Sequence, residues 1–321
     1  MTDFLVIGGA GFIGSHLVGR LLGRPDARVT VFDNLSSGSE RHLDAVAGDT
    51  RLRVLRGDIK DLPALTEAAS GSDVAFLFAS NPDIARAATE PAIDFWEGTY
   101  LVQNVLEACR LGGVGRIVYA SGSGVYGDQG GRKLEESLGP LLPVSTYGAS
   151  KLAGEALISA YCHLFALRGV AFRFANVVGP RQTHGVVYDF VRKLLADPTR
   201  LEIRGDGTQS KSYIHVDDVL DAVVLLADYP PQPFDVYNAA TEDYVTVREI
   251  AELVVESMGC SGVELVFGDT PRGWKGDVPV VRFSSDKLRR RGWSNQRTSW
   301  EALEDSIQAI LAEARAGAAA G

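Results

Sequence analysis

The chain has 321 residues, of which 45% are hydrophobic, and its formal net charge is −9 at pH 7. This length exceeds the usual single core of about 100–200 residues, so we expect one large domain with a smaller one attached. The acidic charge argues against a general nucleic-acid binder and against a protein of anionic membrane surfaces.

The first 33 residues predict a strand, a tight turn, a helix and a second strand that ends on an acidic residue. An apolar run over 4–7 is followed, at intervals of three, by Gly8, Gly11 and Gly14. Helical periodicity over 12–22 and a second apolar run over 29–32 come next, and the run ends on Asp33. Glycines in this context let backbone approach a pyrophosphate, which the N-terminus of the helix then binds. The carboxylate at this spacing accepts from the adenosine ribose and would repel a 2′-phosphate, so the pattern predicts NAD.

Three further apolar runs predict strands over 52–56, 73–78 and 116–120, with a long helix over 91–110 before the last of them. Strands that alternate with helices at this rhythm form a parallel sheet covered on both faces. The predicted fold class is therefore α/β, a doubly wound parallel sheet of the Rossmann type.

Asp58 follows the third predicted strand directly. A carboxylate just beyond the carboxyl end of a parallel strand lies where such sheets bind ligands, so Asp58 could reach the adenine amino group. The alternative is a helix N-cap for the segment that starts near Asp61. The sequence leaves the two interpretations equal.

Tyr147 and Lys151 stand four residues apart on a predicted helix after the fifth strand. This spacing places the phenol and the ammonium one turn apart on the same face. A nearby cation favours phenolate, and we expect the pKa of Tyr147 to be lowered by Lys151 and by the nicotinamide. Such a tyrosine is suited to act as a general base.

The order of these motifs resembles that of the extended short-chain dehydrogenase/reductases. It is similar, more narrowly, to the nucleotide-sugar epimerase/dehydratase family, in which UDP-glucose 4-epimerase is the best-known member. The resemblance covers almost the whole chain and rests, beyond the dyad Tyr147 and Lys151, on the segments 8–14, 33–38, 57–59, 125–127, 173–182, 205–209, 214–219 and 237–240. It implies an enzyme with tightly bound NAD whose substrate is a UDP-hexose, UDP-GlcNAc or UDP-glucose. It also implies that Tyr147 removes the sugar O4 proton while hydride leaves C4, which gives a 4-keto sugar.

The resemblance further implies roles for residues at matching positions. The implied cofactor-binding set is Gly8, Gly11, Phe12, Ile13, Gly14, Asp33, Asn34, Ser37, Asp58, Ile59, Phe78, Ser121, Tyr147 and Lys151. The implied substrate-binding set is Asn176, Lys211, Arg272 and Asp277. A guanidinium suits a diphosphate on chemical grounds as well, whereas Asp277 could equally cap a loop.

The chain departs from the family near the expected sugar site. The position of the family's active-site Ser or Thr is Gly122, so we take the neighbouring Ser123 as the residue that assists Tyr147. The Asp-Glu pair that dehydratases carry next is replaced by Ser123 and Gly124. Other candidates for acid or base are Ser121, Asp83 and Glu97. The loop Ser80-Asn81-Pro82 is a candidate wall of the hexose pocket.

These departures weaken both the simple 4-epimerase and the standard 4,6-dehydratase interpretations. The length and the altered serine position resemble a specialised branch, the UDP-GlcNAc 5,6-dehydratase of tunicamycin-type antibiotic pathways, which removes the C6 hydroxyl. Two rival functions remain open, a simple NAD(P)-dependent reductase and a non-catalytic dinucleotide sensor on the same fold.

The expected domains are an NAD-binding domain over 1–175 and a smaller, interleaved nucleotide-sugar domain over 176–321, whose segment at about 206–240 returns to the sheet. By resemblance, the long helices near 91–110 and 148–167 form a homodimer. Neither a leader segment nor an apolar run near the roughly 18 residues of a membrane span is present, so we expect a cytoplasmic protein. Scattered cysteines and histidines predict reduced thiols and no metal site.

Overall fold

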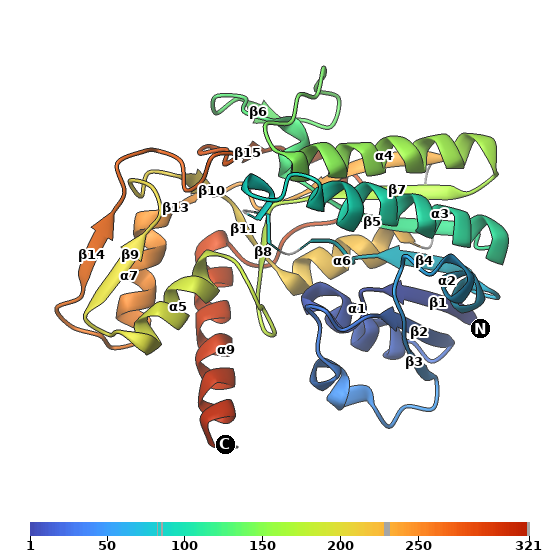
Figure 1. Cartoon of the computed structure of the whole chain (residues 1–321), viewed down its shortest axis with the longest axis horizontal. Coiled ribbons are helices and arrows are strands. Elements are labelled where there is room, and N and C mark those ends of the chain that lie inside the picture. Colours follow the sequence, from blue (N-terminus) through green and yellow to red (C-terminus); the bar gives the residue numbers. More distant parts are fainter. Residues whose placement is uncertain (82, 85, 228–231, 320–321) are drawn as a thin grey trace. The chain divides into compact units, whose positions relative to one another are not determined.

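The computed structural model describes residues 1–81, 83–84, 86–227 and 232–319 (Figure 1). The chain divides into two compact units. The first unit is built from Met1–Val125, Thr146–Arg173 and Leu220–Tyr237. The second is built from Tyr126–Ser145, Phe174–Val219 and Asn238–Gly321. The assignment of a cofactor to one part and a nucleotide sugar to the other stays a prediction.

A seven-stranded sheet, mainly in the first unit, has the order β12-β7-β5-β4-β1-β2-β3 (Figure 1). Its strands are β1 (Thr2–Ile7), β2 (Ala27–Asp33), β3 (Leu52–Arg56), β4 (Val74–Leu77), β5 (Arg116–Gly122), β7 (Arg168–Phe174) and β12 (Phe234–Ala239). The pairs β1–β2, β2–β3, β1–β4 and β4–β5 are parallel. The predicted doubly wound parallel sheet is confirmed, and its strand order reverses between β1 and β4, where such sheets bind ligands.

Both faces of this sheet are buried. On one face, Leu5, Leu77 and Ile117 pack with residues of α2 (Leu62–Ala69), α3 (Tyr100–Gly112) and α4 (Thr146–Leu164), among them Val105 and Ile158. α1 (Phe12–Leu22) covers the other face (Figure 1). Burial on both sides explains why these strands are continuous apolar runs rather than alternating ones.

In the second unit, three helices surround a separate apolar core. These are α5 (Val186–Ala196), α7 (Val247–Ser257) and α9 (Ser299–Ala319), which contribute Val191, Val254 and Ile307. Short strand pairs complete the unit: β9 (Arg200–Ile203) with β14 (Glu264–Phe267), β8 (Asn176–Val178) with β11 (Tyr213–His215), β10 (Ser210–Lys211) with β13 (Val245–Thr246), and β6 (Lys133–Leu134) with β15 (Arg282–Phe283).

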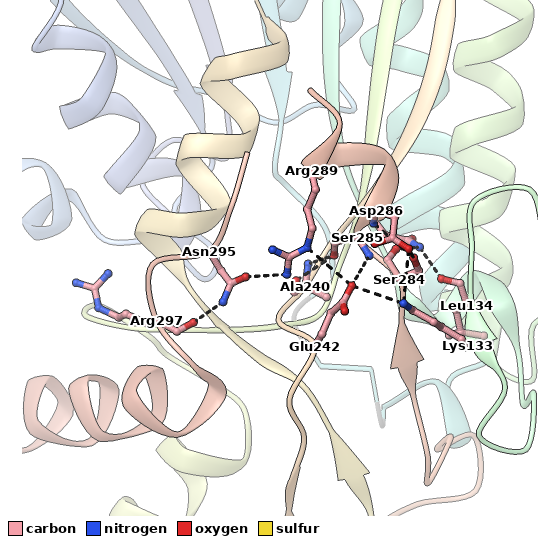
Figure 2. A network of polar contacts seen from close by, with 11 residues as sticks. Lys133, Leu134, Ala240, Glu242, Ser284, Ser285, Asp286, Arg289, Asn295 and Arg297 are labelled. Carbon is pink, nitrogen blue, oxygen red and sulfur yellow. Dashed lines mark hydrogen bonds and ion pairs between the residues drawn. The ribbon is translucent and has the colours of Figure 1, made fainter. Parts of the chain in front are cut away.

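A polar network ties distant segments of the second unit together (Figure 2). The Glu242 carboxylate lies 3.8 Å from both Lys133 and Arg289, and it accepts from the Ser285 backbone N–H at 3.4 Å. Lys133 is also paired with Asp286 at 3.6 Å. The strand pair β6–β15 is therefore held at one end by charges from three segments of the chain.

The expected helix over 91–110 is confirmed from Ile93 onward, but it is not regular. A π-helical segment, η3 (Phe95–Thr99), directly precedes α3, which begins at Tyr100. Gly98 lies against α4 so closely that a Cβ would come within 2.1 Å of the Ser150 hydroxyl. Single π turns occur often at functional sites, and this one lies beside the site described below.

Asp217 and Asp218 lie in the first turn of α6 (Val216–Ala227). Asp218 is fully buried and accepts from the backbone N–H groups of Gln296 at 3.0 Å and Arg297 at 3.3 Å. It therefore anchors the segment that leads into α9.

Within the described ranges, no helix combines the length and the apolar character needed to cross a membrane. In the same ranges, no cluster of three or more His, Cys, Asp or Glu side chains is arranged to hold a metal ion. Cys109 and Cys162 are buried free thiols, as predicted, whereas Cys260 is partly exposed.

Candidate active site

The turn between β1 and α1 forms a tight backbone cradle. Gly8 has φ +82°, and a Cβ at Gly14 would lie 2.1 Å from the Gly8 carbonyl oxygen. Gly38, from the loop after β2, packs on the same turn, where a Cβ would lie 2.7 Å from the Ala10 carbonyl carbon. The first N–H groups of a helix have no partner within it, so those of Phe12 and Ile13 are available for an anion. A side chain would fill this space, so the cradle fits a dinucleotide pyrophosphate.

Asp33 ends β2 and organises the loop around this turn. Its carboxylate accepts from the backbone N–H groups of Ala10 at 2.9 Å and Leu35 at 2.8 Å. Asn34 donates to Asp58 at 3.4 Å. The chain thus brings three predicted adenosine contacts together at the carboxyl ends of β2 and β3.

The two interpretations of Asp58 can now be separated. Asp61 caps α2, because its carboxylate accepts from the Ala64 N–H at 3.1 Å. Asp58 instead accepts from the Lys60 N–H at 2.9 Å and faces Asn34. The helix-cap interpretation of Asp58 is therefore wrong, and the adenine contact stays a prediction. The following Ile59 is buried, and its carbonyl accepts from Asn104 at 3.1 Å.

Tyr147 and Lys151 lie one turn apart at the start of α4. The Lys151 ammonium is 5.5 Å from the centre of the Tyr147 ring and 5.1 Å from that of Tyr119. It donates to the carbonyl of Ala120 at 2.7 Å. Lys151 is 5% exposed, so this cation is held in a low-dielectric position at the end of β5.

Burial dominates the protonation of this dyad. It raises the pKa of Tyr147 to about 12, against a hydrogen bond from Ser80 that lowers it, while the charge of Asp94 raises it further. Burial also lowers the pKa of Lys151 to about 8, against the charges of Glu155 and Asp94. The chain by itself therefore does not lower the pKa of Tyr147, contrary to the expectation from spacing alone. Proximity of a cation is outweighed by desolvation of the phenolate.

A cavity opens beside the dyad within the first unit. It is lined by Ser80, Asn81, Asp94, Glu97, Tyr147 and Lys151, among other residues. Asp94, which is 2% exposed, accepts from Asn81 at 3.0 Å and from Thr146 at 2.7 Å. Asp94 was not predicted as a site residue from the sequence. The one feature that could have indicated it was a carboxylate within the expected helix over 91–110.

Ser121, near the end of β5, and Ser123, just after that strand, have different surroundings. Ser121 is buried and donates to Glu155 at 2.6 Å. Ser123 is half-buried at the start of the short 3₁₀ helix η4 (Ser123–Tyr126). Among the described residues that line the cavity, none belongs to segment 121–124.

The other candidate residues near the expected sugar site also lie in different positions. Glu97 lines the cavity and pairs with Lys60. Asp83 is exposed and accepts from the Arg86 N–H at 3.2 Å. Phe78 is half-buried, and its ring stacks on Phe76 with centroids 6.3 Å apart. Pro82 lies outside the described residues, and Ser37 is exposed on the loop after β2.

The second unit gathers the predicted diphosphate ligands. Lys211 pairs with Asp277 at 2.6 Å, and Asp277 also accepts from the Gly273 N–H at 3.0 Å. Arg272 donates to the Asp277 carbonyl and pairs with Asp128 at 2.6 Å. Asp128, which pairs with Arg272, was not among the substrate-binding residues predicted from the sequence.

Asn176, the fourth predicted substrate contact, lies at the start of β8. It is exposed, and its backbone N–H donates to the Ser212 carbonyl at 3.3 Å, one residue beyond Lys211.

Comparison with known proteins identifies a family. Residues 4–240 match the family described as NAD dependent epimerase/dehydratase. A UDP-glucose 4-epimerase of Mycolicibacterium smegmatis is 33% identical, over 95% of this chain and 97% of that protein. A dTDP-glucose 4,6-dehydratase of Streptomyces griseus is 29% identical, over 93% of this chain and 96% of the relative. A crystal structure of a UDP-galactose 4-epimerase superposes with a TM-score of 0.85 at 37% identity, covering 97% of this chain and 99% of the other.

Proposed function

The chain belongs to the NAD dependent epimerase/dehydratase family, and from that premise we propose that it acts on a UDP-hexose, UDP-GlcNAc or UDP-glucose, through a 4-keto intermediate. The observation that carries the proposal is the dyad of the half-buried Tyr147 and the buried Lys151, which line a cavity of the unit that also contains the glycine cradle. The enzyme is NAD-dependent, and NAD held in the glycine cradle would supply a hydride acceptor that is regenerated within the cycle.

In this proposal Tyr147 receives the proton of the sugar O4 hydroxyl. The positive nicotinamide and Lys151 favour the phenolate, which the buried chain alone disfavours. Lys151 is fixed by the Ala120 carbonyl, so its charge stays beneath the tyrosine ring. The glycine cradle and Asp33 hold the cofactor, and the walls of the cavity exclude water from the reacting atoms.

The fate of the 4-keto sugar distinguishes two candidate reactions. A 4-epimerase returns hydride to the opposite face of C4. The alternative is a UDP-GlcNAc 5,6-dehydratase, in which the acidic C5–H next to the ketone is removed and the C6 hydroxyl leaves. The carboxylates of Asp94 and Glu97 in the cavity support the alternative, because an elimination needs an acid and a base beyond Tyr147.

Asp277 is the proposed acceptor from the uridine ribose, and Asn176, Lys211 and Arg272 are the proposed contacts of the nucleotide diphosphate. The cluster of Lys211 and Arg272 supports this role, because two cations held beside one another suit two phosphates. Asp128 and Asp277 neutralise these cations within the chain itself.

A homodimer is proposed through α3, α4 and the segment that precedes α3. Support comes from large apolar side chains that are exposed there, namely Phe95, Trp96, Leu111, Leu164 and Phe165. Exposed apolar patches of this kind mark protein interfaces. A cytoplasmic location stays a prediction.

The test is proton NMR of the purified enzyme in deuterated water, with UDP-GlcNAc and UDP-glucose in separate samples and no added cofactor. A C4 epimer without deuterium at C5 supports the epimerase. An alkene or a 6-deoxy product with exchange at C5 supports elimination. Steady consumption of added NADH would instead indicate a simple reductase, and turnover of neither sugar would refute the proposed substrates.

A further inference from the structure

The phenol of Tyr147 has a hydroxyl neighbour that the sequence motifs do not identify. Ser80, on the loop after β4, lines the same cavity as Tyr147, and hydrogen bonding from its side chain lowers the pKa of the Tyr147 phenol. Ser121 is already bound to Glu155 at 2.6 Å. Gly122 carries no side chain, and Ser123 is not among the lining residues.

Two hydrogen bonds accepted by Asp94 link the segment that carries Ser80 to the segment that carries Tyr147. Asp94 accepts through one carboxylate oxygen from Asn81 at 3.0 Å, and through the other from Thr146 at 2.7 Å. Asn81 is the neighbour of Ser80, and Thr146 is the neighbour of Tyr147. Asp94 is 2% exposed, so its hydrogen bond with Asn81 forms in a low-dielectric environment, where it is strengthened, whereas its hydrogen bond with Thr146 is partly buried.

We propose that Ser80 is the positioning hydroxyl of Tyr147, and that Asp94 holds the two residues together through Asn81 and Thr146. This inference rests on the proposed function, since it assigns a role toward the tyrosine that receives the O4 proton. The Ser80 hydroxyl donates to the phenolate oxygen before the proton arrives, and Ser80 itself neither gains nor loses a proton overall.

The charged groups around Tyr147 set the sign of the expected effect. Lys151 faces the ring from α4, Asp94 and Glu97 lie in the cavity wall before α3, and Tyr119 lies on β5. Ser80 is neutral, so Ser80→Ala changes none of these charges. Loss of its hydrogen bond therefore raises the pKa of Tyr147, since a donor to the phenolate has been removed.

The first measurement needs no sugar. The phenolate absorbance of Tyr147 is titrated in the NAD-loaded enzyme as the difference between wild type and Tyr147→Phe, and then in a Ser80→Ala background. We expect an upward shift in Ser80→Ala, a smaller upward shift in Thr146→Val, and no shift in Ser80→Thr, which keeps the hydroxyl. Ser159→Ala, a serine further along α4, is the matched control. A Ser80→Ala titration that coincides with wild type would overturn the inference.

The second measurement uses UDP-GlcNAc and UDP-glucose as probes. Ser80→Ala should lower kcat by about 10- to 100-fold, the value of a hydrogen bond to a charged group, with little change in KM. Its pH profile should move upward, and Ser80→Thr should restore it. A loss of the same size in Ser123→Ala with Ser80→Ala unaffected would assign the role to Ser123 instead. If wild type turns over neither sugar, the proposed substrates fail, while the titration still decides the role of Ser80.

Discussion

Arg173 and Glu155 form a buried, doubly hydrogen-bonded ion pair. The guanidinium donates to the two carboxylate oxygens at 3.0 and 2.7 Å, and the two side chains are 4% and 5% exposed. Because Glu155 also accepts from Ser121, the pair joins β7, α4 and the end of β5. Glu155 lies two turns beyond Tyr147 on α4, so the pair fixes the helix that carries the dyad.

Arg173→Leu should destabilise the protein by about 3–5 kcal/mol, because it leaves a buried carboxylate without its partner. Urea unfolding measures the loss, and the double variant with Glu155→Gln should recover part of it. The matched control is Arg28→Leu, whose pair with Asp3 is largely exposed and should contribute far less to stability. Equal losses in Arg173→Leu and Arg28→Leu would contradict the argument.

Gly14→Ala and Gly19→Ala make a matched pair on α1. The new Cβ at position 14 would meet the Gly8 carbonyl oxygen at 2.1 Å, whereas position 19 has nothing within 4 Å. We expect Gly14→Ala to lose bound NAD, because the cradle must open. Gly19→Ala should retain NAD and gain about 0.5–1 kcal/mol, the helical preference for alanine. Cofactor content after gel filtration and thermal unfolding are the measurements, and retention of NAD by Gly14→Ala would refute the cradle.

Lys151→Met should stabilise the protein below pH 8. The pKa of Lys151 falls from 10.5 to about 8 in the folded chain, so between these values the unfolded chain binds a proton that the folded chain has released. The free energy of unfolding of wild type then rises with pH over this range. The advantage of the variant in melting temperature should narrow from pH 8 to pH 10, as followed by circular dichroism. A difference in melting temperature between the variant and wild type that stays constant or widens from pH 8 to pH 10 would contradict this prediction.

Tyr147→Phe should lower kcat by about 10²- to 10⁴-fold, the usual contribution of a general base. Binding of NAD should remain, since the ring and its packing are kept. Tyr188→Phe on α5 is a control for loss of a phenol elsewhere. Product formation by NMR is the measurement, and a fully active Tyr147→Phe would remove the dyad from the mechanism.

Arg272→Lys should raise KM for a UDP-sugar by about 10- to 100-fold and leave kcat nearly unchanged, because the two-pronged contact with a diphosphate is lost while the charge remains. The exposed Arg290→Lys is the matched control. A change in kcat alone would show that Arg272 acts on the chemistry rather than on binding.

Much of the fold could be predicted because its signals are local. The run that ends on Asp33 and the periodicity over 12–22 depend on neighbours in the sequence, and the structure has β2 and α1 where they were expected. The π turn at Phe95–Thr99 could not be predicted, since Gly98 is drawn against Ser150 by packing across fifty residues. Asp94 was not predicted as a site residue for the same reason, because its hydrogen-bond partners Asn81 and Thr146 are distant from it in the sequence.

The protonation of the dyad shows a second limit. Spacing places a cation near Tyr147, but the pKa of the phenol depends on how much water reaches it, and burial is a property of the whole unit. The spacing of residues in a sequence predicts which side chains are neighbours along a helix, but it does not predict how far each side chain is shielded from water.

Each unit is built from three separate segments of the chain, so the parts of one unit are not synthesised consecutively. β12 at the edge of the large sheet lies at Phe234–Ala239, far beyond the other strands in the sequence. The ribosome synthesises β1 to β7 before that edge strand, and α9 follows later still. The large sheet therefore gains its edge strand, and the core of the second unit gains α9, only after those earlier strands have been synthesised.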